Sequence, residues 1–233
     1  MAFDSKTFRT RAGTAVVFVL VMLAGLLWNG WSFIILFTII HFGCWYEYVL
    51  LLKKIRPSGW AALLPFGLLY ITLPLLLFIV CGFPLWHAKG AINNPQQLAD
   101  HYSPVIPCGI ILSIWVNDTM AYIVGSFAGK TPLTTISPKK TWEGTLGGAF
   151  LCVLIITLIG AATKYYRYTD WLIIATCCAL FGTLGDLLES KLKRMAGVKD
   201  SGTFMPGHGG FLDRFDSLLG TGIATGIYVI FCM

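Results

Sequence analysis

Long apolar runs fill most of the chain, and short polar segments separate them. A helix needs roughly 20 apolar residues to cross a bilayer. About seven runs approach that length, at residues 14–28, 31–52, 60–81, 105–127, 144–163, 170–189 and 214–232. The pattern predicts an all-α fold, a polytopic integral membrane helix bundle that forms one domain over residues 1–233.

Local features refine this pattern. Pro65 and Pro74 lie inside the third run and should kink that helix, which membrane helices tolerate. Residues 82–103 are polar and predict a surface loop or a short interfacial helix. The seven cysteines lie within or beside apolar runs without C-x-x-C spacing, so we expect no disulfide framework. Basic residues precede the first run without a small-residue cleavage site after it, so we expect a retained span.

Composition and charge agree with a membrane protein. Hydrophobic residues make up 56% of the chain and charged residues only 12%, with a mean hydropathy of +0.74. The net charge of +6 does not indicate nucleic-acid binding, because the basic residues form no clustered arm. With the N-terminus inside, only Lys89, Lys164 and Arg167 of the 17 basic residues fall outside, which leaves 14 inside. This bias predicts a cytoplasmic N-terminus and a C-terminus on the opposite side.

The longest strongly polar stretch, residues 185–217, carries paired acids. Asp186 and Glu189 are three residues apart, as are Asp213 and Asp216, so each pair shares one helix face. Such pairs suit a hard cation such as Mg²⁺, although a solvated helix face is the alternative. Acids near membrane spans are functional candidates, and Asp118 in the fourth run is another. For Glu47, beside two lysines, a structural ion pair is an equal alternative.

The polar segment after the fourth run offers donors for phosphate. It contains Lys130, Ser137, Lys139, Lys140 and Thr141, all able to contact phosphate oxygens. The Gly-Lys-Thr at its start lacks the glycine spacing and the preceding strand of a phosphate-binding P-loop, which excludes that motif. Taken alone, the segment could equally be an ordinary cytoplasmic loop rich in basic residues.

The polar stretch resembles the signature of phosphatidate cytidylyltransferases (CDP-diacylglycerol synthases). The matching positions are Ser190, Leu192, Lys193, Arg194, Lys199, Asp200, Gly202, Met205, Pro206, His208, Gly209, Gly210, Phe211, Asp213 and Arg214. Met205 stands where the family usually has Leu, Ile or Phe. A second block runs from Asn117 through the Ser137–Gly144 segment, and Leu184–Ser190 continues it. The resemblance covers roughly residues 105–232, whereas bacterial members commonly have more spans than this chain.

The resemblance implies transfer of the cytidylyl group of CTP to phosphatidate, giving CDP-diacylglycerol and pyrophosphate for phospholipid synthesis. It implies a bacterial-type inner membrane with the site facing the cytoplasm, and Mg²⁺ as cofactor. A second cation and a homodimer are also candidates. We expect metal ligands at Asp186, Asp213, Asp216 and Asp118, and further catalytic residues at Lys199, Arg214 and His208. Expected substrate contacts are Lys130, Ser137, Lys139, Lys140, Ser190, Lys193, Arg194, Asp200, Gly209 and Gly210.

Two other functions fit parts of the sequence. A related CTP-dependent kinase acting on a polyprenol or phytol would release CDP instead of pyrophosphate, so its products would differ. An ion-coupled transporter would also place acids within the membrane. Transporters tend to show internal repeats with broken helices in both halves, and we find no such repeat here, because the acids gather in the C-terminal half.

Overall fold

Helices form almost wherever the apolar pattern predicts them. The computed structural model describes residues 5–84, 94–205 and 209–233, with the backbone alone for residues 5–11. No β-strand forms within these residues. The elements are α1 (Ser5–Leu27), α2 (Gly30–Ile55), η1 (Trp60–Leu63), α3 (Leu64–Gly67), η2 (Leu68–Thr72), α4 (Leu73–Cys81), α5 (Pro95–Asp100), α6 (Val105–Ala128), α7 (Trp142–Thr163), α8 (Tyr168–Met195) and α9 (Leu212–Cys232).

The prediction of an all-α membrane bundle is confirmed. In the described chain, 6 helical segments are long and apolar enough to cross a membrane: Gly30–Ile55, Trp60–Cys81, Val105–Ala128, Trp142–Thr163, Tyr168–Met195 and Leu212–Cys232. The apolar part of α1, Ala12–Leu27, is shorter. Large hydrophobic side chains such as Phe42, Phe150 and Leu184 are exposed on the outer faces of the bundle. Such surfaces suit hydrocarbon as the surrounding solvent.

The third span is broken where its prolines lie. Pro65 is the second residue of α3 and Pro74 the second residue of α4, and between them Leu68–Thr72 forms a π-helix. Proline has no backbone N–H and clashes with the carbonyl four residues earlier, and a wider π turn is one way for a helix to accommodate that interruption. The interruption expected at these prolines thus takes the form of a change of helix type.

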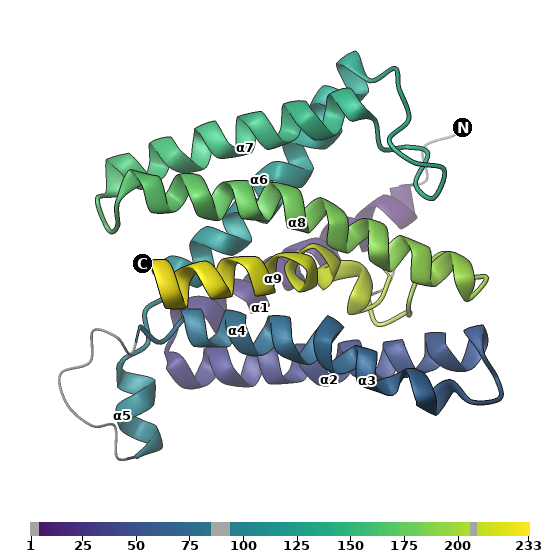
Figure 1. Ribbon diagram of the computed structural model, residues 1–233, viewed down its shortest axis with the longest axis horizontal. Coiled ribbons are helices and arrows are strands. Elements are labelled where there is room, and N and C mark those ends of the chain that lie inside the picture. The colour runs from purple at the N-terminus through teal and green to yellow at the C-terminus, as the bar shows by residue number, and fades with distance from the viewer. Residues whose placement is uncertain (1–4, 85–93, 206–208) are drawn as a thin grey trace.

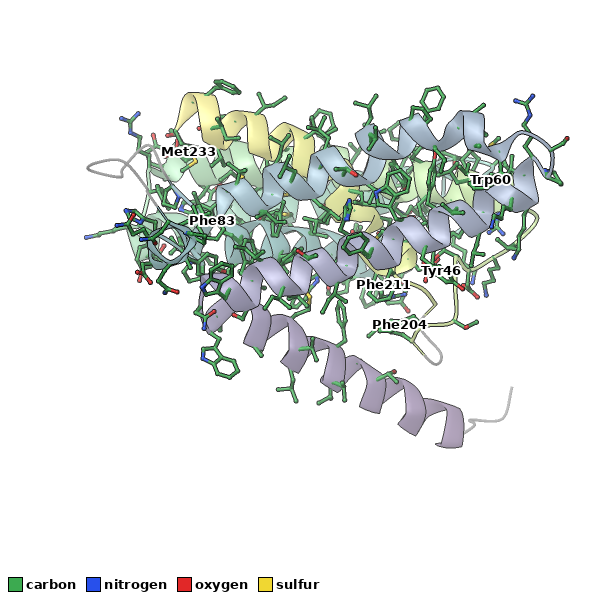
Figure 2. All side chains as sticks on the ribbon, turned by 90° about the horizontal axis from the view of Figure 1, so that it is seen from below. Tyr46, Trp60, Phe83, Phe204, Phe211 and Met233 are labelled. Atoms are coloured by element: carbon green, nitrogen blue, oxygen red, sulfur yellow. The ribbon has the colours of Figure 1, made fainter. Side chains whose placement is uncertain are left out.

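The helices pack side by side with α9 near the middle. In Figure 1, α7 and α8 lie above α9, while α4 and α2 lie below it. The N- and C-termini lie at opposite ends of the bundle (Figure 1). The α2–η1, α6–α7 and α8–α9 connections gather at the end near the N-terminus. α1 contacts α2 but diverges from the other helices (Figure 2).

Small residues let the site-bearing helices approach closely. A Cβ on Gly148 of α7 would lie 2.6 Å from the Cα of Ala121 on α6. A Cβ on Gly185 of α8 would lie 2.9 Å from the Cα of Gly220 on α9. Helices in membranes pack through such small residues because their backbones can then make van der Waals contact. The Gly185–Gly220 contact brings Asp186 on α8 close to Asp216 on α9.

Candidate active site

A polar cavity of about 500 Å³ opens among α6, α7, α8 and α9, at the end of the bundle near the N-terminus. We call it the carboxylate cavity. Its lining comprises Asn117, Asp118, Ala121, Tyr122, Gly125, Ser126, Ser137, Lys139, Lys140, Thr141, Thr145, Thr183, Asp186, Asp213, Asp216 and Ser217. All four predicted metal ligands and four of the five predicted phosphate donors are in this set. Segments separated by up to a hundred residues therefore contribute to one site.

Three carboxylates form a compact trio: Asp186 and Asp216 line the carboxylate cavity, and Glu189 is buried next to them. One oxygen from each of Asp186, Glu189 and Asp216 lies within 4.8 Å of the other two. Asp186 and Glu189 share one face of α8, and Asp216 approaches from α9. Mg²⁺ takes oxygen ligands, so the donor set fits this cation. Of the four ligands predicted from sequence, only Asp186 and Asp216 belong to the trio.

Lysines pair with the trio. Lys140, from the α6–α7 connection, forms an ion pair with Asp186, and Lys193 forms one with Glu189. Glu189 is fully buried, and its Oε1 atom has no hydrogen-bond partner in the described part of the chain. An unpaired carboxylate oxygen in a buried site is costly, so the trio can accept further positive charge.

Asp213 lies beside the trio but is engaged with the α8–α9 connection. Its Oδ1 accepts a hydrogen bond from Lys193 Nζ at 2.6 Å. Its Oδ2 accepts from the backbone N–H of Ser201 at 2.8 Å, from Ser201 Oγ at 2.9 Å and from the Gly210 N–H at 2.8 Å. Hydrogen bonds to a charged acceptor are about twice as strong as neutral ones. The Asp213 carboxylate therefore anchors this connection.

Glu47 provides a second anchor from a distant part of the chain. This α2 residue is 3% exposed. Its carboxylate accepts hydrogen bonds from Ser201 Oγ at 2.6 Å, the Phe211 N–H at 2.9 Å and the Leu212 N–H at 2.9 Å. From the sequence, a functional role for Glu47 and a structural ion pair with a nearby lysine were equal alternatives. In the structure it is hydrogen-bonded instead to the start of α9 and the segment before it.

The glycines of the signature make room for these anchors. Gly209 has φ +86°, a conformation that favours glycine. A Cβ on Gly209 would lie 2.9 Å from Asp213 Cγ, and one on Gly210 would meet the Glu47 carboxylate. We expected both glycines to contact substrate; their close neighbours are the two anchoring acids. Pro206, Gly207 and His208 lie outside the described residues.

The α6–α7 connection forms one wall of the carboxylate cavity. Glu143 on the first turn of α7 accepts hydrogen bonds from the N–H groups of Lys130 and Thr131, both at 3.1 Å. The Thr141 side chain caps α7 by accepting from the Gly144 N–H at 3.1 Å. These contacts hold the connection against the bundle and set Ser137, Lys139 and Lys140 at the wall.

The other predicted contacts divide into two groups. Ser190 donates to Asp186 at 3.3 Å, and Lys193 lies between Glu189 and Asp213, so both support the carboxylates. The second group is exposed and does not line the carboxylate cavity: Lys130, Arg194, Lys199 and Asp200. Arg194 also contacts the carbonyl of Val198 at 3.5 Å, near the end of α8.

Arg214 does not line the carboxylate cavity. The sequence predicts that Arg214 lies on a different helix face from Asp213 and Asp216, because successive residues are rotated by about 100° around the helix axis. Arg214 lines two smaller cavities toward α1, together with Phe18 and Met205. The expected catalytic role of Arg214 therefore has no support from the lining of the carboxylate cavity.

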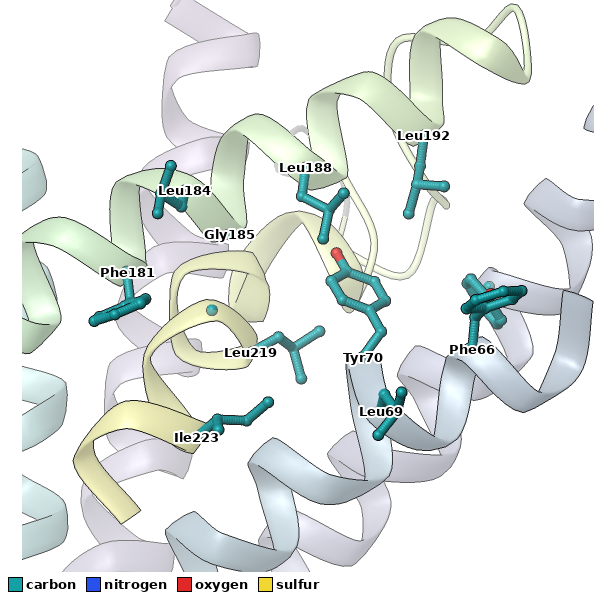
Figure 3. Close-up of a pocket in the computed structure, with 12 residues that line it drawn as sticks. Phe66, Leu69, Tyr70, Phe181, Leu184, Gly185, Leu188, Leu192, Leu219 and Ile223 are labelled. Atoms are coloured by element: carbon teal, nitrogen blue, oxygen red, sulfur yellow. The ribbon is translucent and has the colours of Figure 1, made fainter. Parts of the chain in front are cut away.

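A further cavity, apolar and about 450 Å³, lies on another face of α8 (Figure 3). It is lined by Phe66, Leu69 and Tyr70 of the third span and by leucines of α8 and α9. The Tyr70 hydroxyl points toward Leu188 and has no hydrogen-bond partner among the described groups. Gly185 and Gly220, which meet at the α8–α9 contact, also line this apolar cavity.

Sequence reasoning left several site residues unassigned. Glu189 was paired with Asp186 by spacing but was not included among the ligands, although the same i, i+3 rule could have included it. Ser201, Asn117 and Tyr122 carried no distinctive spacing. Their roles depend on which helices meet, which local sequence patterns do not specify.

Comparisons with known proteins point to one family. The sequence model of the cytidylyltransferase family matches residues 105–232, more than half of the chain. Phosphatidate cytidylyltransferase from Staphylococcus saprophyticus is 50% identical over 111 residues, which cover 46% of this chain and 42% of that protein. The Staphylococcus aureus (strain COL) protein of the same name is 48% identical over 111 residues, with the same coverage.

A plant relative matches as well. Phosphatidate cytidylyltransferase 5, chloroplastic, from Arabidopsis thaliana is 47% identical over 116 residues, or 49% of this chain and 28% of that protein. The matched segment thus spans less than half of each of these relatives. The family match contains every residue of the carboxylate cavity, whereas Glu47 lies outside it.

Proposed function

The chain belongs to the cytidylyltransferase family, and from that premise we propose that it transfers the cytidylyl group of CTP to phosphatidate. The products would be CDP-diacylglycerol and pyrophosphate. The observation that carries the proposal is the carboxylate cavity, where acids from α6, α8 and α9 face Lys139 and Lys140 inside a membrane-spanning bundle. Its volume of about 500 Å³ suits a nucleotide-sized ligand.

The chemistry is a displacement at phosphorus. A phosphate oxygen of phosphatidate attacks the α-phosphorus of CTP and forms a new P–O bond. The bond from the α-phosphorus to the bridging oxygen breaks, and pyrophosphate leaves with that electron pair. The attacking phosphate is already ionised near neutral pH, so the site needs charge stabilisation more than a general base. Preorganised charges are usually the largest contribution to such catalysis.

We assign the cation site to the trio Asp186, Glu189 and Asp216, because their oxygens lie close enough to share one ion. Mg²⁺ bound there would neutralise phosphate charge and stabilise the leaving group. Asp118, elsewhere in the lining, is our candidate ligand for a second cation. We assign Asp213 to anchoring, since its two oxygens accept four hydrogen bonds.

The lysines of the cavity would bind phosphate oxygens. Lys140 forms an ion pair with Asp186. When positive charge binds the trio, Lys140 can turn from Asp186 toward the triphosphate, beside Lys139. Lys193 would stay between Glu189 and Asp213 and keep α8 and α9 in register. In this proposal Lys140 exchanges a carboxylate partner for a phosphate, whereas Lys193 keeps its carboxylate partners.

We further propose that the site faces the cytoplasm of a bacterial-type inner membrane. The positive-inside bias supports this orientation, because the connections rich in lysine and arginine gather at the end that holds the carboxylate cavity. CTP is a cytoplasmic nucleotide, so this orientation would give it direct access. A homodimer stays a prediction from the sequence.

Position-specific labelling of CTP tests the reaction. Purified protein in lipid nanodiscs would receive phosphatidate, Mg²⁺ and CTP labelled at either the α- or the γ-phosphate. Cytidylyl transfer moves the α label into lipid and leaves the γ label in pyrophosphate. A CTP-dependent kinase would instead move the γ label to its lipid alcohol, and this result with a polyprenol would contradict the proposal.

A further inference from the structure

The helix α1 leaves an opening along one side of the bundle. Figure 2 shows α1 diverging from the other helices, with Phe204 and Phe211 on the side of the bundle that faces it. Two cavities of about 230 Å³ and 220 Å³ lie in this opening. Phe18, Met205 and Arg214 line both of them. We call this space the α1 gap.

The walls of the α1 gap are mostly apolar, and Arg214 is the charged residue among those that line it. Val17, Val21 and Ile39 line one cavity, and Trp115 of α6 lines the other. Arg214 is exposed and belongs to none of the ion pairs between described residues. A charged side chain near the membrane interior is costly unless it finds a partner or reaches the interface. An apolar space with one unpaired cation suits an amphiphile that carries a negative charge.

The position of Arg214 links the gap to the carboxylate cavity. On α9, Arg214 lies one turn before Ser217, and on α6, Trp115 lies one turn before Asp118. Arg214 and Trp115 line the α1 gap, whereas Ser217 and Asp118 line the carboxylate cavity. The two spaces therefore lie next to each other along α6 and α9. A phosphate held by Arg214 would lie about one helical turn along α9 from the residues that face the trio.

We propose that the α1 gap holds the lipid substrate, with the phosphate of phosphatidate on Arg214 and an acyl chain between α1 and α2. The role of this lipid as substrate rests on the proposed function. Arginine suits a phosphomonoester because its guanidinium can donate two parallel hydrogen bonds to phosphate oxygens. The lipid arrives from the bilayer beside α1, whereas CTP reaches the carboxylate cavity from water. The assignment replaces CTP with phosphatidate as the partner of Arg214.

Photo-crosslinking tests the site without requiring turnover. The probe is phosphatidate with a diazirine on one acyl chain, and the control probe is diacylglycerol with the same chain. The full chain in phosphatidylcholine nanodiscs would be irradiated with each probe, and the adducts mapped by mass spectrometry. We expect phosphatidate adducts at residues 17–22 and 211–215, about ten-fold more than with diacylglycerol, the scale of a charge-assisted hydrogen bond. Arg214→Gln should remove that difference.

Equal labelling by the two probes, or labelling unaffected by Arg214→Gln, would overturn the proposal and leave the gap filled by bulk lipid or by another copy of the chain. Arg214→Lys should retain part of the phosphate-dependent labelling, because it keeps the charge. A thermal melt of each variant confirms that it is folded. If Arg214→Gln does not fold, the question is decided by comparing phosphatidate with diacylglycerol labelling in the unsubstituted chain.

Kinetics with paired tryptophan substitutions give a second test. Val17 lines the gap, whereas its neighbour Val16 is 58% exposed and lines neither cavity. Val17→Trp should raise KM for phosphatidate about ten-fold with KM for CTP unchanged, and Val16→Trp should change neither. Equal effects of the two substitutions would refute the site.

The proposed function and the proposed lipid site can be refuted independently of each other. If the unsubstituted protein makes no CDP-diacylglycerol but labelling depends on the phosphate and on Arg214, the proposed function is wrong and the lipid site stands. If turnover is present but labelling ignores the phosphate, the lipid site alone is wrong.

Discussion

Asp213 and Asp216 illustrate how similar residues acquire different roles. They lie three positions apart on α9 and both line the carboxylate cavity. Asp213 accepts four hydrogen bonds, three of them from the segment between α8 and α9. Asp216 joins Asp186 and Glu189 in the trio. We therefore expect Asp213 to govern the stability of the connection and Asp216 to govern cation binding.

Asparagine substitutions separate these roles. Without Mg²⁺, Asp213→Asn should lower the free energy of unfolding by about 1.5–3 kcal/mol, because Lys193 and the backbone donors lose a charged acceptor. Asp216→Asn should leave that free energy nearly unchanged but abolish the rise in melting temperature on adding Mg²⁺. Thermal melts with and without Mg²⁺ measure both effects. Asp100→Asn, exposed on α5, is the control. An undiminished Mg²⁺ response in Asp216→Asn would argue against the trio.

Glu47 lies outside the family match, and we expect it to stabilise the fold. Its replacement by glutamine leaves one acceptor oxygen and turns an NH₂ group toward backbone donors of Phe211 or Leu212. We expect a loss of about 1–3 kcal/mol in unfolding free energy and faster proteolysis of the α8–α9 connection. Tyr46→Phe is the matched control, since Tyr46 is the preceding residue and is 68% exposed. Unchanged proteolysis in Glu47→Gln would show that this anchor is dispensable.

At the scale of elements, close helix packing sets the geometry of the site. α8 and α9 meet at Gly185 and Gly220, one residue before Asp186 and four after Asp216. A side chain at this contact would push the two helices apart and with them the carboxylates of the trio. The π-helical turn in the third span, by contrast, lines the apolar cavity and not the carboxylate cavity.

Alanine substitutions at two glycines test this packing. A Cβ on Gly220 would lie 2.7 Å from Gly185 Cα, so Gly220→Ala should lower the melting temperature and weaken Mg²⁺ binding. Gly13→Ala should be neutral or slightly stabilising, because nothing lies within 4 Å of its Cβ position and alanine favours the helix. Titrations of melting temperature with Mg²⁺ compare the variants. Equal behaviour of the two would mean that the α8–α9 contact tolerates expansion.

The apolar pattern predicted these helices well and their polar ends less well. The predicted run 105–127 corresponds to Val105–Ala128. The predicted run 170–189 ends before the helix does, because α8 continues to Met195. Its last turns contain lysines and an arginine, so hydropathy falls while the helix continues, supported by the Lys193 ion pairs. Which acids hold a cation and which anchor a loop depends on contacts with Glu47 and Ser201, and periodicity does not encode those contacts.

For the whole molecule, the ends of the bundle differ in charge and in chemistry. The carboxylate cavity, the trio and most lysines and arginines lie at the end near the N-terminus, and the C-terminus lies at the other (Figure 1). A site at one end of a membrane bundle meets a single aqueous compartment. The orientation of the chain therefore decides which nucleotide pool it can use.

Cysteine labelling in intact cells tests the orientation. Tyr165→Cys lies in the α7–α8 turn and Lys199→Cys in the α8–α9 connection, both exposed and at opposite ends. With Cys232 replaced by serine, an impermeant thiol reagent should label position 165 and spare position 199 until the cells are opened. Labelling of position 199 in intact cells would reverse the orientation and remove the cytoplasmic site.

The most direct measurement is pyrophosphate release from CTP by the purified chain with phosphatidate and Mg²⁺, compared with Asp216→Asn. We predict one pyrophosphate for each CDP-diacylglycerol formed by the unsubstituted protein. Asp216→Asn should be slower by about 100-fold or more, because a charge that stabilises the transition state is lost. Its melt without Mg²⁺ should be unchanged. Pyrophosphate release by Asp216→Asn within a few-fold of the unsubstituted rate would contradict catalysis at the carboxylate trio.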